Sequence, residues 1–174
     1  MTNCKVFVTS DTHFGHAGMC RFLRPDGSRF RPWDDVDEMN EALISRWNEV
    51  VGPKDKVYHL GDFAMNRRYL SVAERLNGRK VLVMGNHDIF KAGDYLKHFE
   101  DIKGAVVKDD AVLTHLPVAA SAFEYRYKLN IHGHTHVSRV THPDGSIDKR
   151  YRCVCVEQTN YYPVEFSTII ASDQ

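Results

Sequence analysis

The sequence predicts an α/β (α+β) protein built as a four-layer sandwich, in which two mainly mixed β-sheets pack face to face and helices cover their outer sides. Up to about residue 100, short apolar runs alternate with segments of helical spacing, whereas most of the later runs are strands. No internal repeat, low-complexity stretch or linker interrupts the 174 residues, a length that suits one hydrophobic core. We therefore expect a single domain over residues 1–174.

The first half of the chain contains the alternation of strands and helices. Short apolar runs predict strands at residues 5–10, 56–60 and 80–84. Between the first two strands, Asp34 or Asp35 is expected to cap a helix that ends at Gly52-Pro53. The apolar residues of this helix follow helical spacing: Val36, Met39, Leu43, Trp47 and Val50. Shorter helices are predicted at residues 69–76 and 94–99.

The second half is predicted to be mostly strands. Residues 104–115 are typical of two strands that flank a turn at Asp109-Asp110, and residues 128–134 form another strand. A turn at Pro143-Asp144-Gly145 precedes a last predicted strand at residues 152–157.

Composition excludes several classes of protein. With 43% hydrophobic residues, 23 basic and 23 acidic residues and a pI of about 7.1, the chain has no general basic field for nucleic acid. No apolar run is long enough for a membrane span, and a charge follows the N-terminus too soon for a secretory signal, so we expect a cytoplasmic protein. Four cysteines without a C-x-x-C pair are expected to be small buried hydrophobic residues.

Five predicted strands end in side chains that can bind a metal ion. The carboxyl ends of parallel strands gather ligands at one edge of a sheet, so we expect these side chains to lie together. Carboxylates, imidazoles and an amide oxygen from several loops can hold two divalent cations, provided that one carboxylate bridges them and reduces their repulsion. The five segments are Asp11-Thr12-His13, Gly61-Asp62, Gly85-Asn86-His87-Asp88, His115 and Gly133-His134-Thr135-His136.

These five segments closely resemble the motifs of the calcineurin-like metallophosphoesterase superfamily, and DTHFGH and YHLGDF are similar to its small, compact bacterial and phage enzymes. The resemblance implies a pair of β-sheets between helices and a binuclear metal centre. It also implies a role for each matching residue: Asp11, His13 and His136 for the first metal, Asn86, His115 and His134 for the second, and Asp62 as the bridge.

The resemblance further implies two catalytic residues. His87 would contact the phosphate and protonate the leaving oxygen, and Asp88 would orient His87 and stabilise its charge. A hydroxide that bridges the metals would be the nucleophile. Mixed nitrogen and oxygen ligation favours transition metals over Ca²⁺, with Mn²⁺ preferred and Fe, Zn²⁺, Ni²⁺ or Co²⁺ as alternatives.

The expected function is therefore hydrolysis of a phosphate ester, with a phosphodiesterase as the leading hypothesis. A phosphomonoesterase or a phosphoprotein phosphatase is the alternative, and the second is disfavoured because no Asp-Arg-Gly element follows Gly61-Asp62. A non-catalytic interaction module on the same fold is a third hypothesis, although every ligand position is filled. The expected partner is a small phosphate ester or a nucleotide. Nucleic acid is possible but not favoured, and no membrane partner is expected.

Other polar residues have weaker signals. His16 and Arg21 are candidates for substrate binding. Arg21, Arg24, Arg29 and Arg31 crowd one loop, where they would form either a rim for a polyanion or, as the preferred interpretation, a solvated basic loop. His59 alternates away from Asp62 and is expected in the core or behind the ligands.

Overall fold

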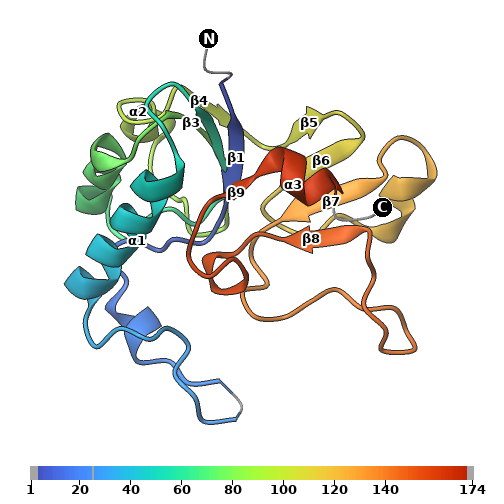
Figure 1. The fold of residues 1–174 in the computed structure, drawn as a ribbon, viewed down its shortest axis with the longest axis horizontal. Coiled ribbons are helices and arrows are strands. Elements are labelled where there is room, and N and C mark those ends of the chain that lie inside the picture. Colours follow the sequence, from blue (N-terminus) through green and yellow to red (C-terminus); the bar gives the residue numbers. More distant parts are fainter. Residues whose placement is uncertain (1–3, 25, 172–174) are drawn as a thin grey trace.

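Two β-sheets form the centre of the computed structural model, which describes residues 4–24 and 26–171 (Figure 1). The first sheet is parallel except for β9, which pairs antiparallel with β1. Its strands, in spatial order, are β4 (Asp101–Lys103), β3 (Arg79–Val83), β2 (Lys56–His59), β1 (Val6–Thr9) and β9 (Val164–Glu165). The sheet is thus mixed, as predicted.

The second sheet is also mixed. An antiparallel hairpin of β5 and β6 turns at Asp109, and β6, β7 and β8 are parallel. In spatial order the strands are β5 (Val106–Lys108), β6 (Ala111–Thr114), β7 (Leu129–His132) and β8 (Tyr151–Cys153).

Apolar side chains hold the two sheets face to face. Val8, Leu60 and Val83 of the first sheet region share one buried cluster with Leu113 and Ile131 of the second. Helix α3 (Phe166–Ala171) completes this cluster with its buried residues Phe166 and Ile169. Because neighbouring strand residues point to opposite faces, Phe7 belongs to a different cluster, on the other side of the first sheet.

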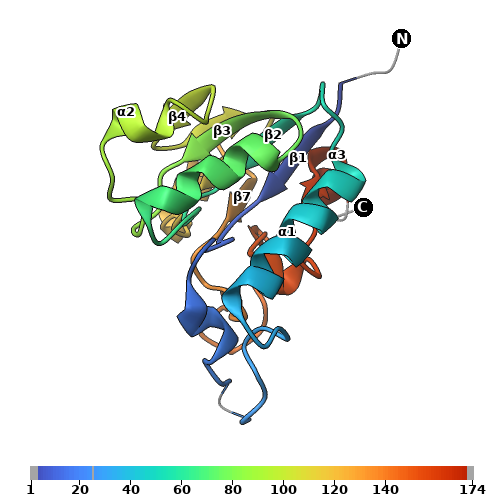
Figure 2. The same ribbon diagram turned by 90° about the vertical axis from the view of Figure 1, so that its left-hand side faces the viewer.

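Helices cover that other side of the first sheet. Helix α1 (Val36–Val50) and the 3₁₀ helix η2 (Arg67–Arg75) lie in front of it in Figure 2. Met39, Leu43 and Trp47 of α1 are buried there, at the predicted spacing. Asp35, one of the two predicted caps, accepts hydrogen bonds from the amides of Asp37 and Glu38 at 2.8 and 2.9 Å.

The outer side of the second sheet has a thinner cover. The 3₁₀ helix η3 (Ala120–Glu124) places the Phe123 ring edge-on against Tyr151, with ring centroids 5.1 Å apart. The Tyr151 hydroxyl donates to the Val118 carbonyl at 2.8 Å. The four layers are therefore unequal, with α1 and η2 on one side and this short segment on the other.

Several elements differ from the predicted ones. The segment at 69–76 is a 3₁₀ helix, and the helix predicted at 94–99 is α2 (Ala92–Tyr95). The strand predicted at 152–157 ends at Cys153, and the chain continues into the 3₁₀ helix η4 (Val156–Gln158). Strands β4 and β9 and helices α3 and η1 (Ala17–Cys20) were not predicted, because two to six residues are too few to establish a hydrophobic period.

The fold brings the polar strand ends together. The amide of Asp11 donates to the Gly61 carbonyl at 3.0 Å, and that of Gly133 donates to the His115 carbonyl at 3.0 Å. A parallel bridge between Ser10 and Cys155 connects the two sheets at the same place. All four cysteines are free, and no helix in the described ranges is both long and apolar enough to cross a membrane.

The cap of α1 gives a test of the fold. Replacing Asp35 by Ala removes the acceptor of two amides at the helix N-terminus and should lower the free energy of unfolding by about 1 kcal/mol. Urea denaturation measures this change. Asp35→Asn is the matched control, because asparagine also caps helices well. Equal destabilisation by the two variants would contradict the assigned cap.

Candidate metal centre

The backbone at the strand ends turns into the left-handed region. This conformation strains residues other than glycine, costs on the order of 1–3 kcal/mol for each residue and is concentrated at functional sites. Five of the seven predicted metal ligands adopt it: Asp11 (φ 59°), His13 (50°), Asp62 (55°), His134 (67°) and His136 (49°). Five of the eight non-glycine residues with positive φ in the described ranges are thus predicted ligands, and the other three are Asp109, Asn160 and Tyr161.

Backbone amides hold one oxygen of each central carboxylate. Asp11 Oδ2 accepts from the amide of His134 at 2.9 Å, and Asp62 Oδ1 accepts from the amide of His87 at 2.8 Å. The side chains of Asp11 and Asp62 are buried, so these hydrogen bonds fix their orientation. Their other oxygens, Asp11 Oδ1 and Asp62 Oδ2, are directed toward histidine rings.

Asp11, His13 and His136 form the first group. Asp11 Oδ1 lies 3.6 Å from His136 Nε2 and 3.8 Å from His13 Nε2. Within the described residues, Asp11 Oδ1 and both ring nitrogens of His13 are buried without a hydrogen-bond partner. Buried polar atoms are almost always paired, so these three atoms need a partner that the protein itself does not supply. Burial opposes ionisation of Asp11, but His13 and His136 hold the pKa of its carboxyl below the ordinary value.

Asp62, His115 and Asn86 form the second group. Asp62 Oδ2 lies 3.5 Å from His115 Nε2 and 3.7 Å from His13 Nε2, between the two groups as a bridging carboxylate must lie. His115 Nδ1 is 2.7 Å from the Leu60 carbonyl and donates to it, so Nε2 of the neutral ring presents a lone pair. That lone pair lies 2.8 Å from Asn86 Oδ1, another acceptor.

These atoms fit divalent cations. Carboxylate oxygens, an amide oxygen and imidazole nitrogens converge here, and together they are the donor set of borderline transition metals. Two overlapping sets of potential ligands, Asp11–His136–Cys155 and Asp11–Asp62–His115, each have their ligand atoms within 4.8 Å of one another. A cation at each place would satisfy the acceptors that the protein leaves unpaired.

Two further predicted residues lie at the exposed side of this cluster. The His134 ring centroid is 5.2 Å from that of His115, and the His87 ring centroid is 5.7 Å from that of His13. Both His87 and His134 are exposed, so they are accessible to a substrate.

The candidate substrate-binding residues differ in position. His16 is half-buried with its ring centroid 5.7 Å from that of His13, and burial lowers the pKa of His16 to about 4. Arg21 is exposed, and in the described part of the chain no contact joins its side chain to the cluster. The structure thus brings His16 to the site and leaves Arg21 outside it.

The expected role of Asp88 needs correction. Its buried carboxylate accepts from the amides of Asp62 at 2.7 Å, Phe63 at 3.1 Å and Gly85 at 2.9 Å. No hydrogen bond to the His87 ring is found among the described residues, because Asp88 turns back under the loops while His87 turns outward. Burial raises the pKa of Asp88, against the effect of its three amide donors. Asp88 fixes the loops after β2 and β3 and is not a partner of His87.

A buried ion pair behind the cluster was not predicted. The Arg31 guanidinium is fully buried and lies 2.6 Å from Glu157 Oε1, while Glu157 Oε2 lies 3.1 Å from His136 Nδ1. Burial lowers the pKa of His136, but Glu157 outweighs it and raises that pKa above its ordinary value. Glu157 therefore orients the His136 ring so that Nε2 is directed toward Asp11.

Arg31 is accordingly not part of a solvated basic loop, as the sequence suggested. Its guanidinium donates to the carbonyls of Asp11 at 2.6 Å and Thr12 at 2.7 Å. Nothing in the local sequence distinguishes Arg31 from its neighbours Arg24 and Arg29, since its partner Glu157 is 126 residues away.

Cys155 is a second residue with an unexpected contact. Its buried thiol donates to Asp11 Oδ2 at 3.2 Å and accepts from the His136 amide at 3.2 Å. The sequence predicted a small buried hydrophobic residue, whereas the structure places this thiol between two predicted ligands.

Comparisons with known proteins agree along most of the chain. Residues 4–153 match the family model of the calcineurin-like phosphoesterase superfamily domain. An uncharacterized protein of Methanocaldococcus jannaschii is 33% identical over 175 residues, covering 98% of this chain and 92% of that protein. The gene 66 protein of Mycobacterium phage L5 is 30% identical over 165 residues, covering 75% of this chain and 76% of that protein. A crystal structure of a protein of unknown function from Aquifex aeolicus has a TM-score of 0.68 and 27% identity, covering 97% of this chain and 98% of that one.

The buried His59 behind this site predicts an effect of pH on stability. Complete burial lowers the pKa of His59 from 6.5 to about 3, and its Nε2 lies 3.0 Å from the Thr12 hydroxyl. Below pH 6.5 the unfolded chain binds a proton that the folded protein excludes. The free energy of unfolding should therefore decrease as the pH is lowered from 6.5 toward 3, by up to about 1.4 kcal/mol per pH unit.

Urea denaturation of metal-free protein between pH 6 and 4.5 measures this slope. His59→Gln and His59→Phe cannot titrate, so both should show a shallower slope than wild type, whatever their absolute stability. A wild-type slope in both variants would contradict the neutral, buried His59.

Proposed function

Because the chain belongs to the calcineurin-like phosphoesterase superfamily, we propose that it is a metal-dependent hydrolase that cleaves phosphodiesters at a binuclear centre. The observation that best supports the proposal is that Asp11 Oδ1 and both ring nitrogens of His13 are buried without a hydrogen-bond partner in the described residues, beside Asp62 Oδ2. Two cations held there would satisfy these atoms, and a phosphate group would then have positive charge to bind.

The proposed ligands follow the two groups of side chains. Asp11, His13 and His136 would hold one cation, with Asp62 shared between the two. The second cation would be held by Asn86, His115 and His134. Mn²⁺ is the preferred ion, and Fe, Zn²⁺, Ni²⁺ and Co²⁺ suit the same donors. Bound cations of this kind polarise phosphoryl oxygens and lower the pKa of a water molecule toward neutrality.

His87 is the proposed general acid. Its ring is exposed beside His13, and its backbone is fixed through the bond from its amide to Asp62 Oδ1. A proton on the outward ring can pass to the leaving oxygen of the ester. General acids of this kind contribute roughly 10²–10⁴-fold to the rate. His16, whose lowered pKa keeps it neutral, would assist in substrate binding.

The charges around the cluster favour a diester over a monoester. Arg31 contacts the predicted ligand Asp11, but its donors are taken by the carbonyls of Asp11 and Thr12 and by Glu157. Arg31 is therefore not available to balance the second charge of a monoester dianion, whereas a diester carries only one charge.

A metal-loading experiment tests the proposed activity. Metal-free protein is loaded with each candidate ion, and hydrolysis of bis-p-nitrophenyl phosphate and p-nitrophenyl phosphate is compared. We expect activity that depends on the metal and is higher with the diester. Higher activity with the monoester would reverse the proposed preference, and the absence of hydrolysis with every ion would support a non-catalytic module.

Two variants separate acid catalysis from metal binding. His87→Ala should lower turnover by roughly 10²–10⁴-fold and keep the metal content of wild type, because its ring is not a proposed ligand. Asp62→Asn should lose both metal and turnover. Elemental analysis and steady-state kinetics measure the two effects. If metal-loaded His87→Ala turned over as fast as wild type, the assigned role of His87 would be wrong.

Glu157 should act on metal affinity from behind His136. Glu157→Gln keeps the size of the side chain but removes the charge that orients the ring, so affinity for the first cation should fall by roughly 10–100-fold. Isothermal titration calorimetry with Mn²⁺ measures the change. Glu165→Gln, at an exposed ion pair with Lys5, is the control and should bind as wild type does. Equal affinities of Glu157→Gln and wild type would refute the coupling.

A further inference from the structure

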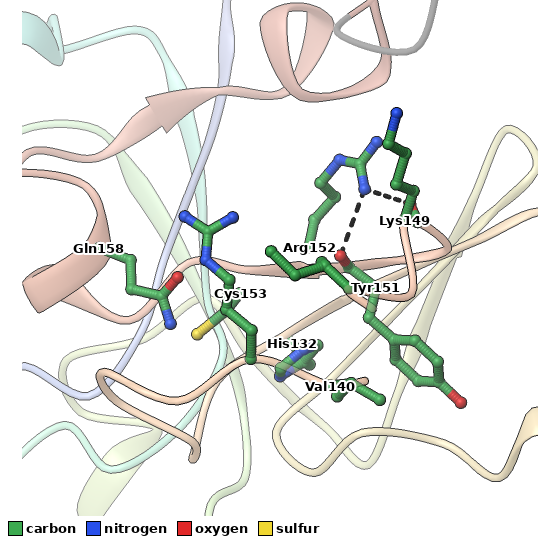
Figure 3. Close-up of a pocket in the computed structure, with 9 residues that line it drawn as sticks. His132, Val140, Lys149, Tyr151, Arg152, Cys153 and Gln158 are labelled. Atoms are coloured by element: carbon green, nitrogen blue, oxygen red, sulfur yellow. Dashed lines mark hydrogen bonds between the residues drawn. The ribbon is translucent and has the colours of Figure 1, made fainter. Parts of the chain in front are cut away.

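A cavity lies beside the edge strand β8, away from the proposed ligands. It has a volume of about 380 Å³ and is lined by residues of β8 and of the long connection between β7 and β8 (Figure 3). Val140, Ile147 and Tyr151 give it an apolar wall. Cys153 and Gln158 also line it (Figure 3), and both side chains donate to the His136 carbonyl.

The charged residues of this cavity all have the same sign. Arg139, Lys149 and Arg152 line it, and no aspartate or glutamate does. The Arg152 guanidinium donates to the carbonyls of Lys149 and Tyr151, as the dashed lines in Figure 3 show. Arg139 and Lys149 are exposed, and within the described residues neither forms an ion pair. Two cations without a countercharge beside an apolar wall make a site for an organic anion.

The cavity contacts the backbone of the loop that carries His134 and His136. Gln158 Nε2 donates to the carbonyls of His136 at 2.6 Å and Ser138 at 2.9 Å. The His136 ring points the other way, toward Asp11 and Glu157. The loop thus separates the cavity from the cluster. A ligand that contacts Gln158 would touch the side chain that holds the His136 backbone in place.

We propose that this cavity is an accessory binding site for a small phosphorylated molecule of nucleotide size. The phosphate binds to Arg139 and Lys149, whose cations supply charge-assisted hydrogen bonds. The organic part of the molecule packs against Val140 and Ile147. Binding here uses none of the side chains proposed as metal ligands, so it requires neither a bound metal nor hydrolysis at the cluster.

The test uses the 174-residue protein without metal, so that the cluster has no cations to hold a phosphate. Isothermal titration calorimetry with AMP and with inorganic phosphate is performed on wild type, on the double variant Arg139→Ala/Lys149→Ala and on Lys103→Ala. Lys103 lies on β4, at the far edge of the other sheet, and controls for the loss of surface charge. Circular dichroism verifies that each variant is folded. Arg139→Gln/Lys149→Gln is a second double variant, which removes both positive charges but keeps longer polar side chains.

We expect saturable binding of AMP to wild type and Lys103→Ala, weaker binding of inorganic phosphate, and at least a tenfold loss of AMP affinity in the folded double variants. The proposal is overturned if wild type shows no saturable binding of AMP, or if the double variants bind AMP as wild type does. Because metal-free protein is used, failure of this test leaves the hydrolase assignment unaffected, and failure of hydrolysis leaves this test unaffected.

Discussion

The convergence of buried lone pairs is the constraint on which the rest of this structure depends. Asp11 Oδ1 lies 3.6 and 3.8 Å from the Nε2 atoms of His136 and His13, and Asp62 Oδ2 lies 3.5 and 3.7 Å from those of His115 and His13. Both carboxylates are buried. Acceptors that face each other in a low-dielectric interior repel, and a neutral protein partner cannot relieve them all. Divalent cations bound there, as we propose, would relieve this repulsion.

Neighbouring carboxylates act as scaffolding for the cluster. Asp88 joins the loops after β2 and β3 through three backbone amides, and Glu157 connects the buried Arg31 to His136. Removing one partner of a buried ion pair commonly costs 3–5 kcal/mol, because the other charge remains uncompensated. Residues that never touch a substrate thus determine how accurately the ligands are placed.

The sequence was sufficient for the two-sheet architecture and for where the ligand-bearing strands end, because apolar runs that stop at polar residues are a local signal. It was insufficient wherever position depends on distant partners. Arg31 forms a buried ion pair with Glu157. Asp88 accepts hydrogen bonds from the amides of Asp62 and Phe63, in another loop, and none from the His87 ring in the described residues. Strand β9 has only two residues, Val164 and Glu165, and forms by pairing with β1. Two residues are too few to show the alternation that predicts a strand.

The left-handed backbone at Asp11, His13, Asp62, His134 and His136 has a consequence for how this protein can change. Glycine tolerates that conformation better than the residues present, so replacing any one of the five by glycine would relax the backbone there. The same replacement would remove a proposed ligand. Folding stability and the proposed chemistry therefore set opposite demands on the same five positions.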